Sequence, residues 1–287
     1  MREVGGHVSA AGGIELAIER GAEIGGNCVQ VFSGSPRVWA RPELSRFDAK
    51  KIAAKRAEKG IGSIITHSLY LVNLASENPE LITKSMTALA FDLKFDAHIS
   101  GNGVVVHVGS HKGAGWVACR EEVRKHIQTL VDEAPEGATF LIENAASPNG
   151  KIGGKLEEVQ WLINEIDSPK LGWCFDTCHA FTAGYGLGKS QPAGSALPRT
   201  AAEEIDHLGL WATLKCVHVN DSRDPFGSGR DRHENLGNGL IPPEDMEYFL
   251  NLPQLEHVPL ILEVPGLEQL GPDAANITRL KKLIHEA

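Results

Sequence analysis

Residues 172–176 read Gly172-Trp173-Cys174-Phe175-Asp176, an apolar run that stops on a residue able to bind a metal. Five other strand-like segments end in the same way: Ser63-Ile64-Ile65-Thr66-His67, Gly103-Val104-Val105-Val106-His107, Thr139-Phe140-Leu141-Ile142-Glu143, Lys215-Cys216-Val217-His218 and Leu260-Ile261-Leu262-Glu263. Six such endings along one chain indicate parallel strands whose ends converge. The pattern predicts a (β/α)₈ TIM barrel with a metal cluster at its C-terminal face, where barrel enzymes carry their chemistry.

Short apolar runs alternate with helix-like runs along the chain. We expect strands at about residues 3–9, 28–33, 63–67, 103–109, 139–144, 171–177, 215–221 and 259–264. We expect helices at residues 13–24, 48–59, 79–99, 116–133, 155–167, 199–208, 243–250 and 273–285. Strict alternation implies a parallel sheet, and eight units imply closure. Because the chain has no Pro/Ser-rich linker, we expect residues 1–287 to form a single domain.

Composition and charge narrow the class of protein. The chain is 42% hydrophobic and 23% charged, as globular domains are, and no stretch approaches 18 consecutive apolar residues. The N-terminus lacks an apolar signal region and the five cysteines are irregularly spaced, so we expect a reduced, cytoplasmic protein without disulfides, away from any membrane. The net charge of −9 argues against nonspecific nucleic-acid binding but allows a local basic surface.

Nine candidate metal ligands fall at or just beyond the predicted strand ends. They are His67, His107, Glu143, Asp176, His179, His218, Asp231, His233 and Glu263. Asp231 and His233 are two residues apart, so an extended backbone points both side chains the same way. Any single residue of this kind is more often a satisfied polar group than a ligand, but nine on one predicted rim reverse that balance.

The ligand types indicate the chemistry. Nine ligands are too many for one ion and suit two or three, and imidazole with carboxylate but no thiolate suits zinc, manganese or iron. Polynuclear sites of this kind hydrolyse phosphodiesters, because one metal lowers the pKa of a bound water while others hold the phosphate and neutralise the leaving oxygen.

The chain resembles the endonuclease IV family of apurinic/apyrimidinic endonucleases from Gly6-His7-Val8-Ser9-Ala10-Ala11-Gly12-Gly13 to Ile261-Leu262-Glu263. The most specific pieces are His67-Ser68-Leu69-Tyr70-Leu71-Val72-Asn73-Leu74, His107-Val108-Gly109-Ser110-His111, Ile142-Glu143-Asn144, Phe175-Asp176-Thr177-Cys178-His179-Ala180-Phe181, His218-Val219-Asn220-Asp221 and Asp231-Arg232-His233. The resemblance implies a TIM barrel that carries three zinc ions, with manganese as the alternative at one site.

The resemblance also implies which ligands serve which ion. By motif, His67, His107 and Glu143 would hold the first zinc, with Glu143 also bridging to a second as the catalytic residue. Asp176, His218 and Glu263 would complete the second site. His179, Asp231 and His233 would hold the third.

A DNA-reading role is implied for Arg37, Tyr70 and Leu71, which match family residues that enter the duplex at the lesion. An abasic nucleotide has lost its stacking and costs less to flip out, so side chains can fill the gap. The alternative is that Tyr70 and Leu71 have only a structural role and pack at the rim of the barrel. Basic residues in the loops that follow strands could form the local phosphate footprint: Arg37, Arg41, Arg46, Lys112, Lys189, Arg223, Arg230 and Arg232.

The function implied is hydrolysis of the phosphodiester 5′ to an abasic site in duplex DNA, in base-excision repair. It would leave a 3′-hydroxyl and a 5′-deoxyribose phosphate, and removal of 3′-blocking groups would be a second activity. We expect a monomer that acts at the nucleoid if the source is bacterial. The alternatives are a metal-dependent sugar isomerase or epimerase on a related barrel, which needs fewer ligands, and a module that recognises damaged DNA without cutting it.

Overall fold

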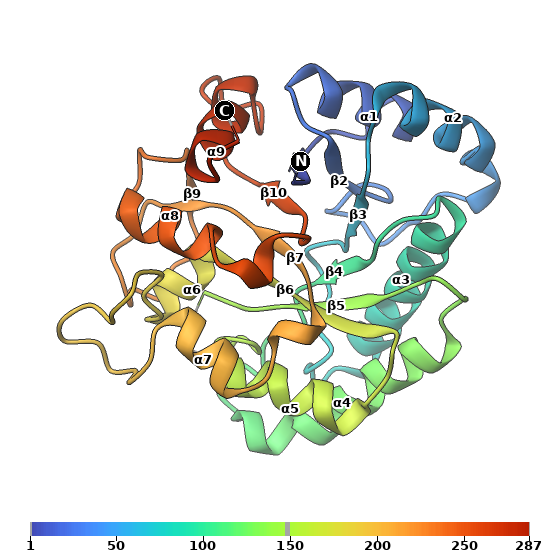
Figure 1. Cartoon of the computed structure of the whole chain (residues 1–287). Helices are drawn as coiled ribbons and strands as arrows, with labels where there is room; N and C mark the ends of the chain where they lie inside the picture. Colours follow the sequence, from blue (N-terminus) through green and yellow to red (C-terminus); the bar gives the residue numbers. More distant parts are fainter. Residues whose placement is uncertain (1, 147–149, 287) are drawn as a thin grey trace.

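The computed structural model describes residues 2–146 and 150–286, and its centre is a closed parallel barrel (Figure 1). Eight strands form it: β1 (Val4–His7), β2 (Cys28–Phe32), β3 (Ile64–His67), β4 (Val104–Val106), β5 (Phe140–Glu143), β6 (Leu171–Asp176), β7 (Leu214–His218) and β10 (Leu260–Leu262). Their order around the barrel is β1-β10-β7-β6-β5-β4-β3-β2, and every neighbouring pair is parallel. The predicted (β/α)₈ fold is confirmed.

Helices surround the barrel and match the predicted runs to within two residues at each end. They are α1 (Ile14–Glu23), α2 (Ala49–Lys59), α3 (Pro79–His98), α4 (Trp116–Glu133), α5 (Leu156–Ile166), α7 (Ala201–His207), α8 (Pro243–Leu250) and α9 (Ala274–Leu283). Side-chain caps fix several starts: Asp48 accepts bonds from two amides of α2, and Thr200 and Glu203 form a reciprocal capping box on α7. In the described part of the chain no helix is long and apolar enough to cross a membrane.

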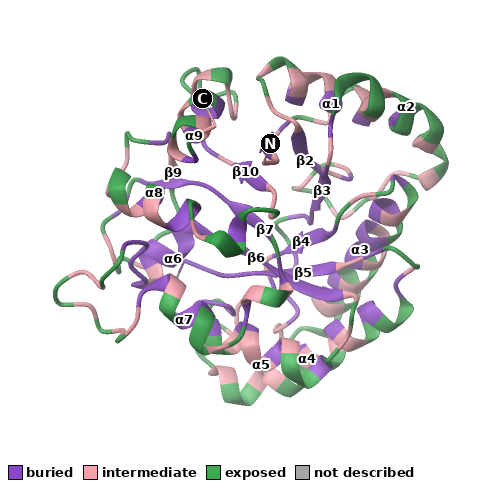
Figure 2. Ribbon diagram, in the orientation of Figure 1, coloured by how far each residue is buried: buried purple, intermediate pink, exposed green. Residues whose placement is uncertain are grey.

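The core has an inner and an outer layer. Seven side chains that point into the barrel form the inner layer: Cys28, Ile65, Val105, Leu141, Cys174, Cys216 and Ile261. The alternate strand residues pack outward against the helices, so the strands are buried on both sides while the outer helix faces are exposed (Figure 2). All five cysteines are free, and the predicted core packing of Cys28, Cys174 and Cys216 is confirmed.

Several short elements were not predicted. Helix α6 (Thr177–Ala183) starts immediately after β6, between the strand expected at 171–177 and the helix expected at 199–208. Strands β8 (Asp221–Ser222) and β9 (His233–Glu234) pair antiparallel beyond β7, and three 3₁₀ turns lie at Leu44–Arg46, Trp211–Thr213 and Pro253–Leu255. The expected strand at 103–109 is shorter than predicted, because the chain leaves the sheet before Gly109, whose φ is +117°.

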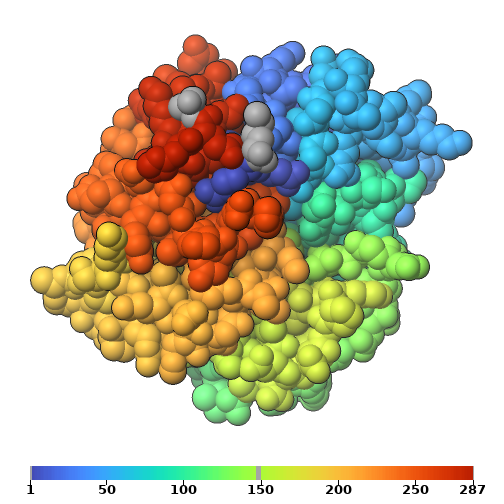
Figure 3. All heavy atoms as spheres, viewed as in Figure 1, coloured from blue at the N-terminus to red at the C-terminus, as the bar shows by residue number. Residues whose placement is uncertain are grey.

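The first and last described residues, Arg2 and Glu286, lie beside each other near the start of β1 (Figures 1 and 3). There the amide of Arg2 donates to Glu286 Oε1 at 2.7 Å, and the Arg2 guanidinium donates to the carbonyls of Leu250 and Leu255. The opposite end of the barrel, where the strands finish, carries the predicted ligands.

Candidate metal centre

Glu143, the last residue of β5, is the hub of the cluster. Its Oε1 lies 3.1 Å from His218 Nδ1 and 3.3 Å from His179 Nδ1. Its Oε2 lies 3.3 Å from His107 Nε2 and 3.5 Å from His67 Nε2. Because each oxygen faces a different pair of imidazoles, a single fully buried carboxylate lies between two sets of candidate ligands.

The ligand atoms fall into overlapping groups in which all atoms lie within 4.8 Å of one another. The groups are His67, His107 and Glu143; Glu143, Asp176, His218 and Glu263; and Asp176, His179 and His233. Asp231 adjoins the last group, since its Oδ1 lies 3.1 Å from His179 Nε2 and 3.5 Å from His233 Nε2. The structure therefore brings all nine predicted ligands together.

Several buried atoms at the centre of the cluster make no hydrogen bond. Among the described residues, these are Glu143 Oε2, His179 Nε2 and His233 Nε2, which have only ion-pair contacts within the cluster. A buried polar atom without a hydrogen bond costs about 1–3 kcal/mol, and bound cations would satisfy these atoms. Four carboxylates and five imidazoles also suit more than one divalent ion. The donor set thus fits a polynuclear metal site.

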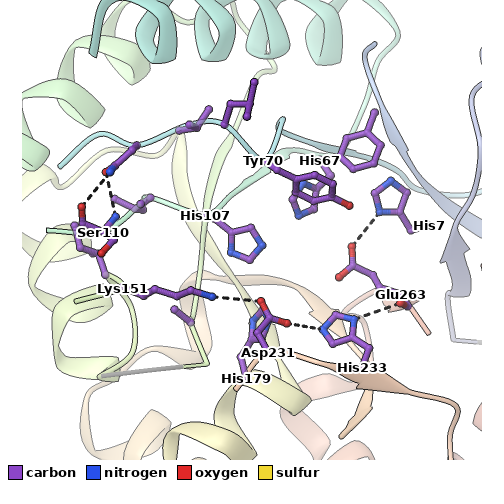
Figure 4. A pocket seen from close by; sticks show the side chains of 18 of the residues that line it. His7, His67, Tyr70, His107, Ser110, Lys151, His179, Asp231, His233 and Glu263 are labelled. Carbon is purple, nitrogen blue, oxygen red and sulfur yellow. Dashed lines mark hydrogen bonds and ion pairs between the residues drawn. The ribbon is translucent and has the colours of Figure 1, made fainter. Parts of the chain in front are cut away.

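A pocket of about 980 Å³ opens directly above the cluster. His7, His67, His107, His179, His233 and Glu263 form its floor (Figure 4). Tyr70, Leu71, Lys112 and Lys151 lie around its rim. The candidate ligands are consequently open to a large molecule from one side and closed off by the barrel on the other.

Comparison with known proteins agrees with this geometry. A family model described as a xylose isomerase-like TIM barrel matches residues 18–283. A protein of Haloarcula marismortui named probable endonuclease 4 is 36% identical over 283 residues, which are 99% of each chain. One of Sulfurihydrogenibium sp. with the same name is 34% identical and covers 99% of this chain and 100% of its own. The chain belongs to the endonuclease IV family.

Solved structures separate the family from its fold neighbours. The crystal structure of endonuclease IV from Thermus thermophilus matches with a TM-score of 0.85 and 32% identity, over 99% of this chain and 100% of that one. A D-tagatose 3-epimerase-like protein matches 99% of this chain and 97% of its own with a TM-score of 0.70 and 19% identity, and this second likeness concerns the fold alone. The endonuclease IV family and an epimerase-like protein therefore share one scaffold.

In this member of the endonuclease IV family, neighbouring oxygens fix which imidazole nitrogen faces the cluster. His218 Nε2 lies 2.8 Å from Gln30 Oε1, so Nε2 donates to that carbonyl oxygen and Nδ1 faces the cluster. His67 Nδ1 lies 2.7 Å from Ser68 O, and His179 Nδ1 lies 2.9 Å from Asn144 O. Each of these contacts leaves the remaining ring nitrogen free to bind a cation, which is the arrangement typical of metal-binding histidines.

Buried amides hold the carboxylates in place. Asn220 Nδ2 donates to Asp176 Oδ2 at 2.6 Å, and Asn220 Oδ1 accepts from the Glu263 amide at 2.8 Å. Gln30 Nε2 donates to Glu263 Oε1 at 2.7 Å. Sequence reasoning did not single out Gln30. The available signal was an amide in the middle of an otherwise apolar strand, where a polar side chain needs a partner.

Helix α6 explains the spacing between Asp176 and His179. Asp176 is the N-cap of this helix, and its Oδ1 accepts a bond from the His179 amide at 2.7 Å. The first helical turn therefore folds His179 back over Asp176, so one strand end supplies two candidate ligands.

The charges of the cluster stabilise one another. Burial by itself would raise the pKa of Glu143, but the imidazoles of His107, His218 and His179 outweigh it and hold that pKa well below its usual value. Burial likewise opposes ionisation of Glu263, and His218 reverses the effect and lowers its pKa. Both carboxyl groups are thus ionised at neutral pH, as cation ligands must be.

The proposed DNA-contacting residues lie on the rim. Tyr70 is 58% exposed and Leu71 is 37% exposed, so neither is packed into the rim as a core residue. The Tyr70 amide donates to the Pro36 carbonyl at 3.1 Å, which joins the Tyr70 segment to the loop that carries the exposed Arg37. Tyr70 and Leu71 therefore line the pocket, and Arg37 lies in the loop bonded to their segment.

The predicted basic footprint is smaller than the sequence suggested. Arg232 pairs with Asp224 at 2.6 Å, Arg230 lies 3.5 Å from the same carboxylate, and Arg223 pairs with Glu234 at 3.0 Å. Two carboxylates thus offset part of the charge of the three arginines, a pairing that the sequence could not reveal because it crosses the β8–β9 turn.

Two further histidines near the mouth have different roles. His7 Nδ1 lies 3.0 Å from Glu263 Oε1, so His7 supports a candidate ligand. His111 Nδ1 accepts from the amides of Gly113 and Gly115 at 3.2 and 3.0 Å, and so organises the turn before α4.

Proposed function

We propose that the chain is a metal-dependent endonuclease of DNA base-excision repair. It hydrolyses the phosphodiester 5′ to an abasic site in duplex DNA, leaves a 3′-hydroxyl and a 5′-deoxyribose phosphate, and also removes 3′-blocking groups. The observation that carries this proposal is the nine-ligand cluster with unpaired buried atoms beneath a wide pocket. Membership of the endonuclease IV family supports it.

The proposed cofactor is three zinc ions per chain, with manganese as the alternative at one position. His67, His107 and Glu143 would hold one, Asp176, His218 and Glu263 with Glu143 a second, and His179, Asp231 and His233 the third. When bound, such ions lower the pKa of water and neutralise the charge of the phosphate. Glu143 is the proposed catalytic residue, because its two oxygens face the first two groups.

The protein's own residues supply orientation. Gln30, Asn144 and Asn220 hold the ligands before substrate arrives, so little reorganisation is needed during the reaction. Arg37, Tyr70 and Leu71 would enter the duplex where the abasic nucleotide leaves it, since a nucleotide without a base costs less to unstack. We propose that residues 1–287 act as a single monomeric domain. A DNA substrate would place the activity inside the cell, at the nucleoid in a bacterium.

The competing function is sugar isomerisation or epimerisation on the same fold. Glu143, Asp176, His218 and Glu263 alone could hold one metal over a hydroxy-ketone. That chemistry leaves the other five candidate ligands without a purpose, which favours the nuclease.

The test uses zinc-loaded protein and a duplex with one tetrahydrofuran abasic analogue, beside an intact duplex. The analogue cannot undergo β-elimination, so any nick is hydrolytic. We expect selective nicking on the 5′ side that a chelator abolishes. Binding without nicking would favour the recognition module, and neither binding nor nicking with metals bound would favour sugar substrates.

A further inference from the structure

Lys151 is a pocket residue that the motifs of the family did not point to. It follows β5, and its backbone pairs with Ser110 in an isolated antiparallel bridge. The Gly150 carbonyl accepts from the His111 amide at 2.8 Å, and the Ile152 amide donates to the Gly109 carbonyl at 3.0 Å. These bonds join the loop after β4 to the loop after β5, so the base of the Lys151 side chain is fixed at the rim.

The side chain reaches across the pocket toward Asp231 (Figure 4). Its Nζ lies 3.5 Å from Asp231 Oδ2, while Asp231 Oδ1 faces His179 Nε2 and His233 Nε2 at 3.1 and 3.5 Å. The two oxygens of Asp231 thus contact different groups. One belongs to the candidate metal group and the other meets the ammonium on the pocket side.

The Lys151–Asp231 contact is too weak to be there for stability. Lys151 is 47% exposed and Asp231 is 33% exposed, and ion pairs this open to water contribute little to stability. An ammonium has three donors, so one contact to Asp231 leaves two available on this half-exposed side chain. A cation held at this place, with spare donors above a metal group, is suited to an oxyanion.

We propose that Lys151 is a phosphate-binding residue of this site, which contacts the phosphate under attack from the side of Asp231. The inference rests on the proposed function and deepens it, because it adds a protein cation to the ions that would neutralise the phosphate. With the candidate groups filled by divalent ions, the charge of Asp231 is shared with them and the ammonium is free to donate to a phosphate oxygen.

The test measures binding of inorganic phosphate to the zinc-loaded full chain by calorimetry, in wild type, K151M, K151R and K155M. Lys155 is an exposed lysine of the same segment that does not line the pocket, so K155M controls for the loss of one positive charge. Because K151M removes a charged hydrogen bond to the phosphate, it should weaken phosphate binding by about tenfold or more. K151R should recover most of the affinity, and K155M should match wild type.

Zinc content and resistance to a chelator are measured on the same samples. Unchanged metal content in K151M, together with weaker phosphate binding, supports direct contact. Loss of zinc in K151M would mean that Lys151 works through Asp231, and equal phosphate affinity in K151M and wild type would overturn the proposal outright.

Nicking of the tetrahydrofuran duplex separates this inference from the proposed function. If both hold, K151M lowers kcat/KM by about tenfold while K155M does not. If wild type binds phosphate through Lys151 but never nicks the duplex, the phosphate site stands and the nuclease assignment fails.

Discussion

The floor and the rim of the pocket are built in different ways. Directly beneath the floor, Glu143, Asp176 and His218 are fully buried and each ends a barrel strand. On the rim, Tyr70 and Leu71 are exposed and lie on a loop. The strand register fixes the floor through many backbone bonds, whereas the rim depends on a few side chains. Positions that do chemistry are therefore set by the fold, and positions that would read the substrate are set by local contacts.

Arg41 shows how few contacts hold the rim. Its guanidinium donates to the carbonyls of Ser35 at 2.9 Å and Trp39 at 3.4 Å, and also to the carbonyl of Val38. It thereby braces the loop that presents Arg37. A substitution on the floor should consequently abolish chemistry, while one on the rim should weaken recognition and leave chemistry in place.

The largest effect is expected from Glu143→Gln. The amide keeps the shape but removes the charge that lies between two ligand groups, so turnover on an abasic duplex should fall by about 10³-fold, as when other groups that stabilise transition-state charge are removed. Single-turnover nicking measures the change, and circular dichroism checks the fold. Turnover equal to wild type would remove Glu143 from its catalytic role.

Away from the pocket, the interface between α3 and the barrel carries a buried carboxyl group with an altered pKa. Burial raises the pKa of Asp96 from 3.8 to about 7, although Thr66 Oγ1 and the Gly103 amide donate to its oxygens. The folded state therefore keeps a proton that the unfolded chain loses near pH 4. Asp96 accordingly contributes most to stability at low pH, and that contribution is lost as pH rises through about 7.

Asp96→Asn should remove this dependence. Between pH 5 and pH 8, the free energy of unfolding of wild type should fall relative to the variant by on the order of 2–3 kcal/mol, measured by urea unfolding at both values. If the difference in free energy of unfolding between wild type and Asp96→Asn is the same at pH 5 and pH 8, Asp96 ionises normally.

On the rim, Tyr70→Ala should weaken binding to abasic duplex by about tenfold, since stacking of a base on an aromatic ring is worth about 1–3 kcal/mol. Binding to intact duplex should change little. Fluorescence anisotropy measures both affinities, and Tyr70→Phe, which keeps the ring, should retain the preference. An unchanged affinity of Tyr70→Ala for the lesion would refute insertion by this side chain.

The smallest effect is expected from Arg41→Met. Loss of its bonds to the loop carbonyls should speed amide hydrogen exchange in residues 34–40 and lower lesion affinity by roughly threefold, with metal content unchanged. Arg46→Met is the matched control, because it removes the same charge from the same segment without those three bonds. Equal rates of amide exchange in the two variants would mean that Arg41 does not stabilise the loop.

Much of the fold and the floor was predictable from the sequence. Strand ends that carry His, Asp or Glu predicted both the parallel barrel and the convergence of the nine candidate ligands. The reason is that the C-terminal ends of parallel barrel strands all lie at the same face. The resemblance supplied the grouping of ligands, which no spacing could reveal.

What the sequence missed has physical causes. Helix α6 is buried nearly all round, so it shows no amphipathic period, and two-residue strands such as β8 and β9 are too short to show any. The roles of Lys151 and Gln30 depend on contacts with distant parts of the chain. Lys151 contacts Asp231, which is 80 positions away, and Gln30 contacts Glu263, which is 233 positions away. Contacts of that range are absent from any local pattern.

The most direct test of the account is a count of metal ions. Protein prepared without added chelator, dialysed and analysed by mass spectrometry, should carry close to three divalent ions per chain, and His179→Ala with Asp231→Ala should lose one of them while the other two remain. The three groups of candidate ligands predict that result. One ion per chain in wild type, unaffected by those substitutions, would contradict the polynuclear centre and favour the single-metal sugar chemistry of the competing function.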